Sequence, residues 1–302
     1  MFTAIATIRR KPWLPVVFGA AVFFLPARAS AATEPFAWDP AWHKFRWTEG
    51  VATVGFIATA YAEDKYLKNP TTPRWTGGIL LDNQIRGLLR GSNHEQRAAT
   101  IYADTNVAVL SLFPYFDAAV ALTLHRDPEV AAQMFLINAQ AQSFTGSVTL
   151  FTKWAVGRQR PFARDCTGGK SGSHDCGSSY DNGSFFSGHT VTAFTGAGLT
   201  CVHHEHLPLY GGGAPDKWAC VWTLIGAGSS AVLRIISDDH YASDVMVAAG
   251  VGFLTGYVIP SWLHYGFGRT RTSKPRRAGD VQIVPTLQPV AGGIGIGLAG
   301  SM

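Results

Sequence analysis

Long helical segments with little strand pattern between them are the feature that most constrains this chain. The segments that favour helix are 47–66, 80–89, 95–124, 129–157, 189–206, 217–236 and 240–263. Asp127 and Pro128 form a start signal for the fourth, and we expect Pro114 to interrupt the third. Strand-like alternation occurs only at 281–284 and around Ile294. The sequence therefore predicts an all-α bundle of about six main helices, with a short tail that could form a β-hairpin.

Residues 1–31 have the features of an export signal. Basic residues at 9–11 precede an uncharged apolar run at 13–25, and small residues between 27 and 31 predict cleavage near Ala31. The alternative is an uncleaved membrane anchor, for which the apolar run is short. We expect an exported protein of the periplasm or cell envelope. Its parts would be a signal peptide, a helical domain and a basic, glycine-rich tail, at 1–31, 32–268 and 269–302.

The positive charge of the chain is concentrated in that leader. The sequence has 25 Lys and Arg against 20 Asp and Glu, and four of the basic residues but none of the acids lie in the first 31. The remainder is nearly neutral, so the charge gives no reason to expect a nucleic-acid partner. One basic stretch remains at 269–277, which could touch anionic lipid head groups or be a solvated linker.

Four cysteines in an exported protein predict two disulfides, with three possible pairings. Cys166 and Cys176 lie in one loop, and Cys201 and Cys220 flank a turn at 206–216, so we expect each neighbouring pair to be joined. A zinc site is the alternative, but no CxxC spacing supports it.

Two cations and a proline end the fourth helical segment. Lys153 and Arg160 are seven residues apart, nearly two helical turns, so we expect them on one face of the helix. Pro161 then stops the helix. Alone, the pattern also fits a solvated basic helix end.

Ser187, Gly188 and His189 open the next helical segment, directly after a Gly/Ser-rich loop at 164–184. Serine is a favoured N-cap residue, and glycine lets a ligand approach the backbone. The free N–H groups of a helix N-terminus bind anions. Alone, the pattern also fits an ordinary capped helix with an incidental histidine.

The third cluster is Arg234, His240 and Asp244. A separation of four on a helix would let the Asp244 carboxylate accept the N–H of one His240 ring nitrogen. The other nitrogen would then be free as a nucleophile or base. We expect Asp238 and Asp239 to lie at the N-terminus of the following helix and to interact with its dipole.

The three clusters are more informative together than singly. They supply fixed positive charge for the oxygens of a tetrahedral oxyanion and histidines on either side of it. Each lies at a helix end, and antiparallel packing of consecutive helices would bring these ends to the same end of the bundle.

Over about residues 135–263 the chain resembles the type 2 phosphatidic acid phosphatase and vanadium haloperoxidase superfamily. The pattern of that family is K-x6-RP, then P-S-G-H, then S-R-x5-H-x3-D. The matching residues are Lys153, Arg160, Pro161, Ser187, Gly188, His189, Arg234, His240 and Asp244. Phe186 stands where the pattern has Pro, and Leu233 where it has Ser. Neither position carries a catalytic group, so these departures concern loop geometry.

The resemblance implies a role for each residue. His240 would attack phosphorus and become a phosphohistidine, with Asp244 orienting it. His189 would protonate the leaving oxygen and then help to activate water. The groups that hold the phosphoryl oxygens would be Lys153, Arg160, Ser187, Gly188 and Arg234. The scheme requires no metal or other cofactor, and vanadate would inhibit as a phosphate mimic.

Several questions stay open in the sequence. The same anion pocket would serve a phosphatase acting on a lipid phosphate, a diphosphate or a small soluble ester, or a vanadium-dependent haloperoxidase, for which the chain is short. The segment 245–263 has no charge and could span a membrane, whereas Pro114 and the polar residues of 137–152 favour a soluble or peripherally attached bundle. The histidines at 203–206 resemble a metal-binding tract, but we expect a capping role at the surface. The oligomeric state is not indicated.

Overall fold

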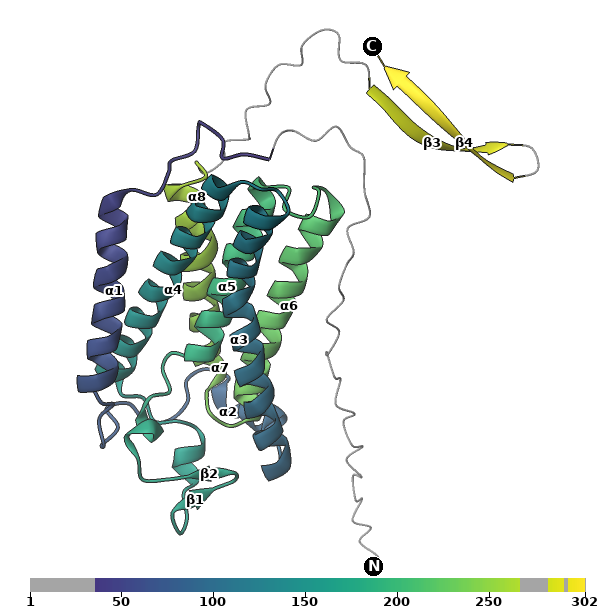
Figure 1. Ribbon diagram of the computed structural model, residues 1–302. Coiled ribbons are helices and arrows are strands. Elements are labelled where there is room, and N and C mark those ends of the chain that lie inside the picture. Colours follow the sequence, from purple (N-terminus) through teal and green to yellow (C-terminus); the bar gives the residue numbers. More distant parts are fainter. Residues whose placement is uncertain (1–35, 267–281, 291–292, 302) are drawn as a thin grey trace, which may run out of the picture.

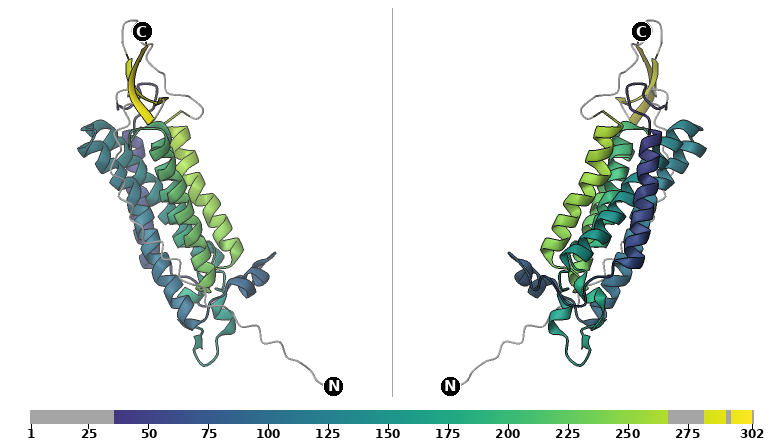
Figure 2. Two further views of the ribbon diagram at one scale, coloured as in Figure 1. Left: turned by 90° about the vertical axis from the view of Figure 1, so that its right-hand side faces the viewer. Right: turned by 90° about the vertical axis from the view of Figure 1, so that its left-hand side faces the viewer.

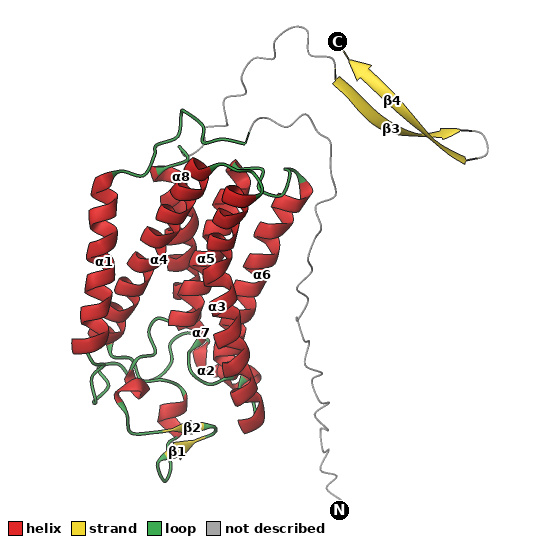
Figure 3. Ribbon diagram, viewed as in Figure 1, coloured by secondary structure: helices red, strands yellow, loops and turns green. Residues whose placement is uncertain are grey.

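The computed structural model describes residues 36–266, 282–290 and 293–301, and within them it confirms the all-α architecture (Figure 1). The helices are α1 (Trp47–Tyr66), α2 (Asp82–Leu89), α3 (Asn93–Thr123), α4 (Pro128–Val156), α5 (Gly188–His206), α6 (Ala214–Ile236), α7 (Ala242–Phe253) and α8 (Ile259–Leu263). Strands β1 (Lys170–Ser171) and β2 (His174–Asp175) pair within the loop between α4 and α5. Figure 3 shows that the bundle itself is helix and loop, apart from this short pair.

Helix α5 is the central element of the bundle and packs against α3, α4, α6 and α7. Glycines allow the closest approaches. A Cβ at Gly196 would overlap the backbone carbonyl of Leu110 on α3, and one at Gly256 would overlap that of Thr195. Because glycine has no side chain, these backbones can lie in direct contact.

Helix α3 runs through Pro114 without a break, so the expected interruption is wrong. The neighbouring helix α4 supplies hydrogen bonds at this turn. Asn138 Nδ2 donates to the carbonyl of Pro114 at 2.9 Å, and Gln142 Nε2 donates to that of Ser111 at 2.6 Å. These bonds tie α3 to α4 at the turn where the proline removes a helical hydrogen bond.

The last helical segment also differs from the expectation. Helix α7 begins at Ala242, not at His240, and a π-helical turn at Leu254–Val258 separates it from α8. His240 therefore lies in the loop between α6 and α7. His240 and Asp244 are therefore not one turn apart on the same helix.

The long helices run up and down the bundle, so alternate ends meet at one end of the molecule. The C-terminal ends of α4 and α6 and the N-terminal ends of α5 and α7 lie at the lower end in Figure 1, beside the β1–β2 loop. In both side views of Figure 2 the loop between α4 and α5 again lies at the lower end of the bundle. The three sequence clusters therefore share one end of the bundle.

Two disulfides join the expected neighbours, Cys166 to Cys176 and Cys201 to Cys220. The first closes the loop between α4 and α5, and the second ties α5 to α6. No cysteine in the described residues is free.

His203 and His204 do not lie on the surface, so the expected capping role is wrong for these two; His206 is half-buried, and its Nδ1 lies 2.8 Å from the carbonyl oxygen of Val202 in the last turn of α5. His203 is buried and its ring contacts Tyr265 Oη at 2.7 Å and Asn138 Oδ1 at 2.8 Å. His204 is also buried, with Nδ1 at 2.6 Å from Asp216 Oδ1. Among the described residues no group of three or more His, Cys, Asp or Glu is placed to hold a metal ion. His203 and His204 therefore belong to a buried hydrogen-bond network at the end of the bundle opposite the three sequence clusters.

Within the part of the chain that the structure describes, three stretches are long and apolar enough to cross a membrane, namely α3, α6 and the continuous run Ala242–Leu263. Large apolar side chains are exposed along several helices, among them Trp47 on α1, Leu112 on α3, Trp222 on α6 and Trp262 on α8. Exposed apolar surface of this extent is typical of membrane contact. The absence of a break at Pro114 removes one of the arguments for a soluble bundle.

The C-terminal tail contains the expected hairpin. Strands β3 (Gln282–Val290) and β4 (Gly293–Ser301) pair antiparallel, from Gln282 opposite Ser301 to Val290 opposite Gly293. The predicted signal peptide at 1–31 and the basic stretch at 269–277 lie outside the described residues.

Candidate active site

Lys153 occupies the last turn of α4, and its ammonium group lies beside the start of α5. A Cβ added at Gly188 would be 3.4 Å from Lys153 Nζ, so glycine leaves room for the cation at the helix N-terminus. Burial, together with the charges of Arg160 and Arg234, lowers the pKa of Lys153 to about 7. The charges of these three cations therefore act on one small volume.

Arg160 does not share a helix face with Lys153, because α4 ends at Val156 and Gly157 adopts a left-handed conformation. Arg160 instead lies in the loop after the helix, where it is buried. Its Nε donates to the carbonyl of Tyr180 at 2.9 Å, and its guanidinium lies 3.8 Å from the centre of the Tyr180 ring. The charged groups of Lys153 and Arg160 therefore lie near each other because the chain changes direction after α4, and not because they share a helix face.

His240 is buried in the loop before α7, with each ring nitrogen in a distinct environment. Nδ1 lies 2.7 Å from the carbonyl oxygen of Ser184, so it carries the proton and donates it. Nε2 lies 3.3 Å from Arg160 Nη1 and is left as the acceptor. Burial and the nearby Arg160, Arg234 and Lys153 hold the pKa of His240 well below its usual value, which keeps the ring neutral. A neutral imidazole with a free Nε2 lone pair is a nucleophile.

Asp244 does not orient His240 directly, which corrects the expectation from their spacing. The carboxylate is 3.8 Å from His240 Nδ1, beyond hydrogen-bond distance. It accepts hydrogen bonds from Ser184 Oγ at 2.6 Å and from the N–H of Tyr241 at 2.9 Å. Asp244 therefore fixes Ser184, and the carbonyl of Ser184 in turn fixes the His240 ring.

His189 is the second residue of α5 and pairs with a residue that the sequence did not single out. Its Nε2 is 2.6 Å from Oδ1 of Asp104, on α3. Burial, Arg234 and Lys153 lower the pKa of His189 to about 4, while the Asp104 carboxylate acts in the opposite direction. A carboxylate at this distance favours the protonated imidazole.

Ser187 caps α5, as its sequence position predicted. The buried Ser187 Oγ accepts the N–H of Thr190 at 3.4 Å and the Thr190 hydroxyl at 3.0 Å. Since both contacts use its lone pairs, the Ser187 proton can be donated to a ligand. The free N–H groups of the first turn of α5 lie beside it.

Arg158 is a second residue that the sequence reading missed. It is fully buried between the rings of Trp75 and Tyr241, at 3.9 and 4.2 Å from their centres. Its guanidinium forms ion pairs with Asp244 and with Asp82 of α2. The available signal was an arginine two residues before Arg160. Arg158 holds Asp244, and so supports the loop that carries the histidine.

Asp238 and Asp239 have separate partners, and neither serves the N-terminus of α7 as expected. Asp238 forms ion pairs with Arg86 and Arg90. Asp239 lies between the two arginines of the candidate site, with a carboxylate oxygen 3.2 Å from Arg160 Nη1 and another 2.8 Å from Arg234 Nη2. No pattern in the sequence indicated this bridge.

The arrangement can bind and polarise a phosphoryl group. Lys153, Arg160 and Arg234 supply positive charge, and the cap of α5 supplies neutral hydrogen-bond donors. The neutral His240 could act as a nucleophile, and the carboxylate-paired His189 could carry a proton. Fixed donors of this kind stabilise charge that develops on phosphoryl oxygens in a transition state.

Comparison with known proteins agrees with this geometry. Residues 132–267 match the PAP2 superfamily. The matched segment, which contains all three sequence clusters, therefore resembles this superfamily. In addition, 124 residues are 32% identical to the lipid A 1-phosphatase of Porphyromonas gingivalis, covering 41% of this chain and 22% of that protein. The match thus spans about a fifth of the relative's length. No solved structure matches the chain.

Proposed function

We propose that this protein is a phosphatase that removes a phosphoryl group from a phosphorylated lipid through a phosphohistidine at His240. The observation that carries the proposal is the His240 ring, whose Nδ1 proton is held by Ser184 and whose Nε2 lies beside Arg160. No metal or other cofactor enters the scheme.

In the first step, His240 Nε2 forms a bond to phosphorus while the bond from phosphorus to the leaving oxygen breaks. His189, protonated in the complex with the phosphate anion and Asp104, gives its proton to that oxygen. In the second step a water attacks the phosphohistidine, and His189 takes a proton from it. The N–P bond then breaks, which releases phosphate and restores both histidines.

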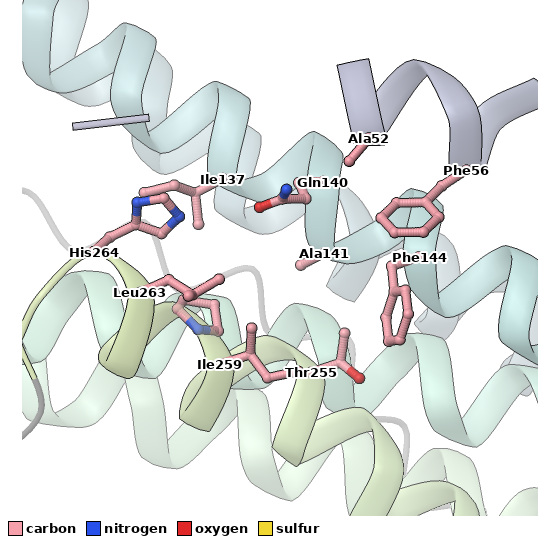
Figure 4. Close-up of a pocket in the computed structure, with 11 residues that line it drawn as sticks. Ala52, Phe56, Ile137, Gln140, Ala141, Phe144, Thr255, Ile259, Leu263 and His264 are labelled. Atoms are coloured by element: carbon pink, nitrogen blue, oxygen red, sulfur yellow. The ribbon is translucent and has the colours of Figure 1, made fainter. Parts of the chain in front are cut away.

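A lipid substrate is supported by the apolar surface and by an apolar cavity of about 220 Å³ (Figure 4). The cavity lies between α1, α4 and the segment from the π turn to α8, and Figure 4 shows the rings of Phe56 and Phe144 at one end of it. On α4 its lining begins nine residues before Lys153, which is about 14 Å along the helix axis. An acyl chain attached to a bound phosphate could reach this depth. The relative named above is a lipid A 1-phosphatase.

The test is phosphate release by the purified full chain in detergent from lipid A, from long-chain and short-chain phosphatidate, and from p-nitrophenyl phosphate. We expect His240→Ala to abolish turnover of each, because no other group supplies the nucleophile. Rapid quenching in alkali, in which the N–P bond of phosphohistidine is stable, of a reaction with a substrate labelled in its phosphoryl group should leave label on the wild-type protein and not on His240→Ala. The control is His94→Ala, an exposed histidine on the first turn of α3.

Three results would contradict the proposal. Undiminished turnover in His240→Ala would exclude the phosphohistidine. A preference for small soluble esters over the long-chain lipids would exclude a lipid substrate. Halide oxidation with peroxide and vanadate, without phosphate release, would assign the pocket to haloperoxidase chemistry.

A further inference from the structure

The carboxylate of Asp239 lies inside the candidate phosphate site, although carboxylates repel phosphate. It bridges Arg160 and Arg234, two of the three cations that would hold the phosphoryl oxygens. Asp239 is almost completely buried, at 1% exposure, so its charge is weakly screened by solvent. The site therefore contains a permanent anion next to the place where the substrate anion binds.

Two further contacts hold this carboxylate in place. Tyr180 donates its hydroxyl to Oδ1 at 3.0 Å, and Ser237 donates its hydroxyl to Oδ2 at 2.6 Å. The backbone N–H of Asp239 also donates to the carbonyl of Arg234 at 3.2 Å. Because its contacts come from several directions, the carboxylate is a fixed part of the site. The neighbouring cations keep its pKa well below the usual range, so it is ionised at any working pH.

The charge of the site depends on this residue. When Lys153 is protonated, as a bound anion favours, Lys153, Arg160 and Arg234 together present three positive charges, and Asp239 reduces this to two. A phosphate monoester or inorganic phosphate carries up to two negative charges near neutral pH. Binding that is equally strong for substrate, product and transition state does not raise turnover. A third uncompensated charge would therefore strengthen the binding of product phosphate.

We propose that Asp239 is a built-in counter-anion that sets the net charge of the phosphate site and limits the affinity for product phosphate. The proposal rests on the proposed function, since it concerns the same site. It predicts that removing the charge while keeping the shape makes phosphate bind more tightly. If Asp239 only oriented the two arginines, the same change would make phosphate bind more weakly.

Asp239→Asn is the informative variant, because its amide oxygen can still accept from one arginine and its size is unchanged. Asp238→Asn is the matched control. That residue is adjacent and also fully buried, but its partners are Arg86 and Arg90, outside the site. It adopts a φ of 63°, a conformation that asparagine tolerates.

The measurement is the dissociation constant of inorganic phosphate and of vanadate for each full-length protein, by calorimetry at low ionic strength and neutral pH. We expect affinity for both anions to rise about tenfold in Asp239→Asn, as removal of a close buried charge implies. Asp238→Asn should stay within about twofold of wild type. Product inhibition by phosphate should increase in parallel in Asp239→Asn only.

Unchanged or weaker anion binding in Asp239→Asn, with an unchanged melting temperature, would overturn the inference. Equal tightening in both variants would also overturn it, because the effect would then be a general change of charge. If the wild-type protein binds neither anion, the proposed function itself fails, and this result is separable from the variant comparison. Circular dichroism establishes that each variant is folded.

Discussion

His189 depends on a residue from another helix for its proton. Burial and two cations favour the neutral ring, and Asp104 on α3 is the carboxylate that opposes them. A proton is needed most when the leaving group is a poor one, since an alkoxide is a strong base. The contribution of general acid catalysis is commonly about 100-fold or more.

We therefore expect Asp104→Asn to slow the hydrolysis of an alkyl phosphate about tenfold or more, with little effect on p-nitrophenyl phosphate. The p-nitrophenolate ion leaves without a proton, so the loss should depend on the leaving group. Rates across a series of phosphate esters measure this dependence. Asp64→Asn, at an exposed position on α1, is the control. A uniform loss across the series would show that Asp104 only supports the structure.

At the level of single residues, the sequence singled out the candidate groups for phosphate binding but not the groups that hold them. Lys153, Arg160 and His240 stand in a recognisable order along the chain. Asp104 stands in a segment without a motif, and Arg158 occupies a position that the first motif leaves open. Chain order does not show which segments meet in space. The direct bond from Asp244 to His240 was wrong because a spacing of four is informative only inside a helix, and His240 precedes α7.

The helices of the bundle approach each other at glycines, and this makes the contact between α3 and α5 sensitive to small changes. A Cβ at Gly196 would overlap the carbonyl of Leu110, whereas one at Gly228 on α6 would have no atom within 4 Å. Neither glycine has a positive φ. Alanine substitutions at Gly196 and Gly228 therefore distinguish the effect of helix packing on stability from the effect of helix propensity.

We expect Gly196→Ala to destabilise the protein by about 1–3 kcal/mol, the usual cost of overpacking. Gly228→Ala should be neutral or stabilising by up to about 1 kcal/mol, because alanine favours helix. Thermal unfolding followed by circular dichroism compares them in the same detergent. Equal melting temperatures would show that α3 and α5 can move apart without loss.

At the level of elements, most helices could be predicted because each carries its own start or stop signal, such as Asp127 before α4 and Gly157 after it. The exceptions depend on tertiary contacts. Helix α3 passes Pro114, and Asn138 and Gln142 of α4 bond to carbonyls at that turn. No local pattern in residues 93–123 could indicate this support.

The whole molecule combines an apolar exterior with a charged site at one end. Three candidate membrane spans among the described residues, together with exposed residues such as Trp47 and Trp222, indicate membrane association. A lipid substrate is presented at a membrane surface, so this location would bring the site to its substrate.

We expect the protein to sediment with membranes, to remain there after washing with high salt, and to be released by detergent. Apolar contacts are not weakened by salt, whereas electrostatic attachment is. Immunoblotting of the fractions is the measurement, and a basic, peripherally bound protein from the same cells is the control. Release by salt alone would show that charge, not the apolar exterior, holds the chain at the membrane.

The pairing of His189 with Asp104 has a consequence for how this catalytic unit could be transplanted. The segment that matches the PAP2 superfamily begins at residue 132, yet Asp104 and Asp82 lie before it, and both contact residues of the site. A chimaera cut at the family boundary would keep every motif residue and still lose these two carboxylates. The smallest portable unit therefore includes α2 and α3, and a graft onto another scaffold must supply their carboxylates as well.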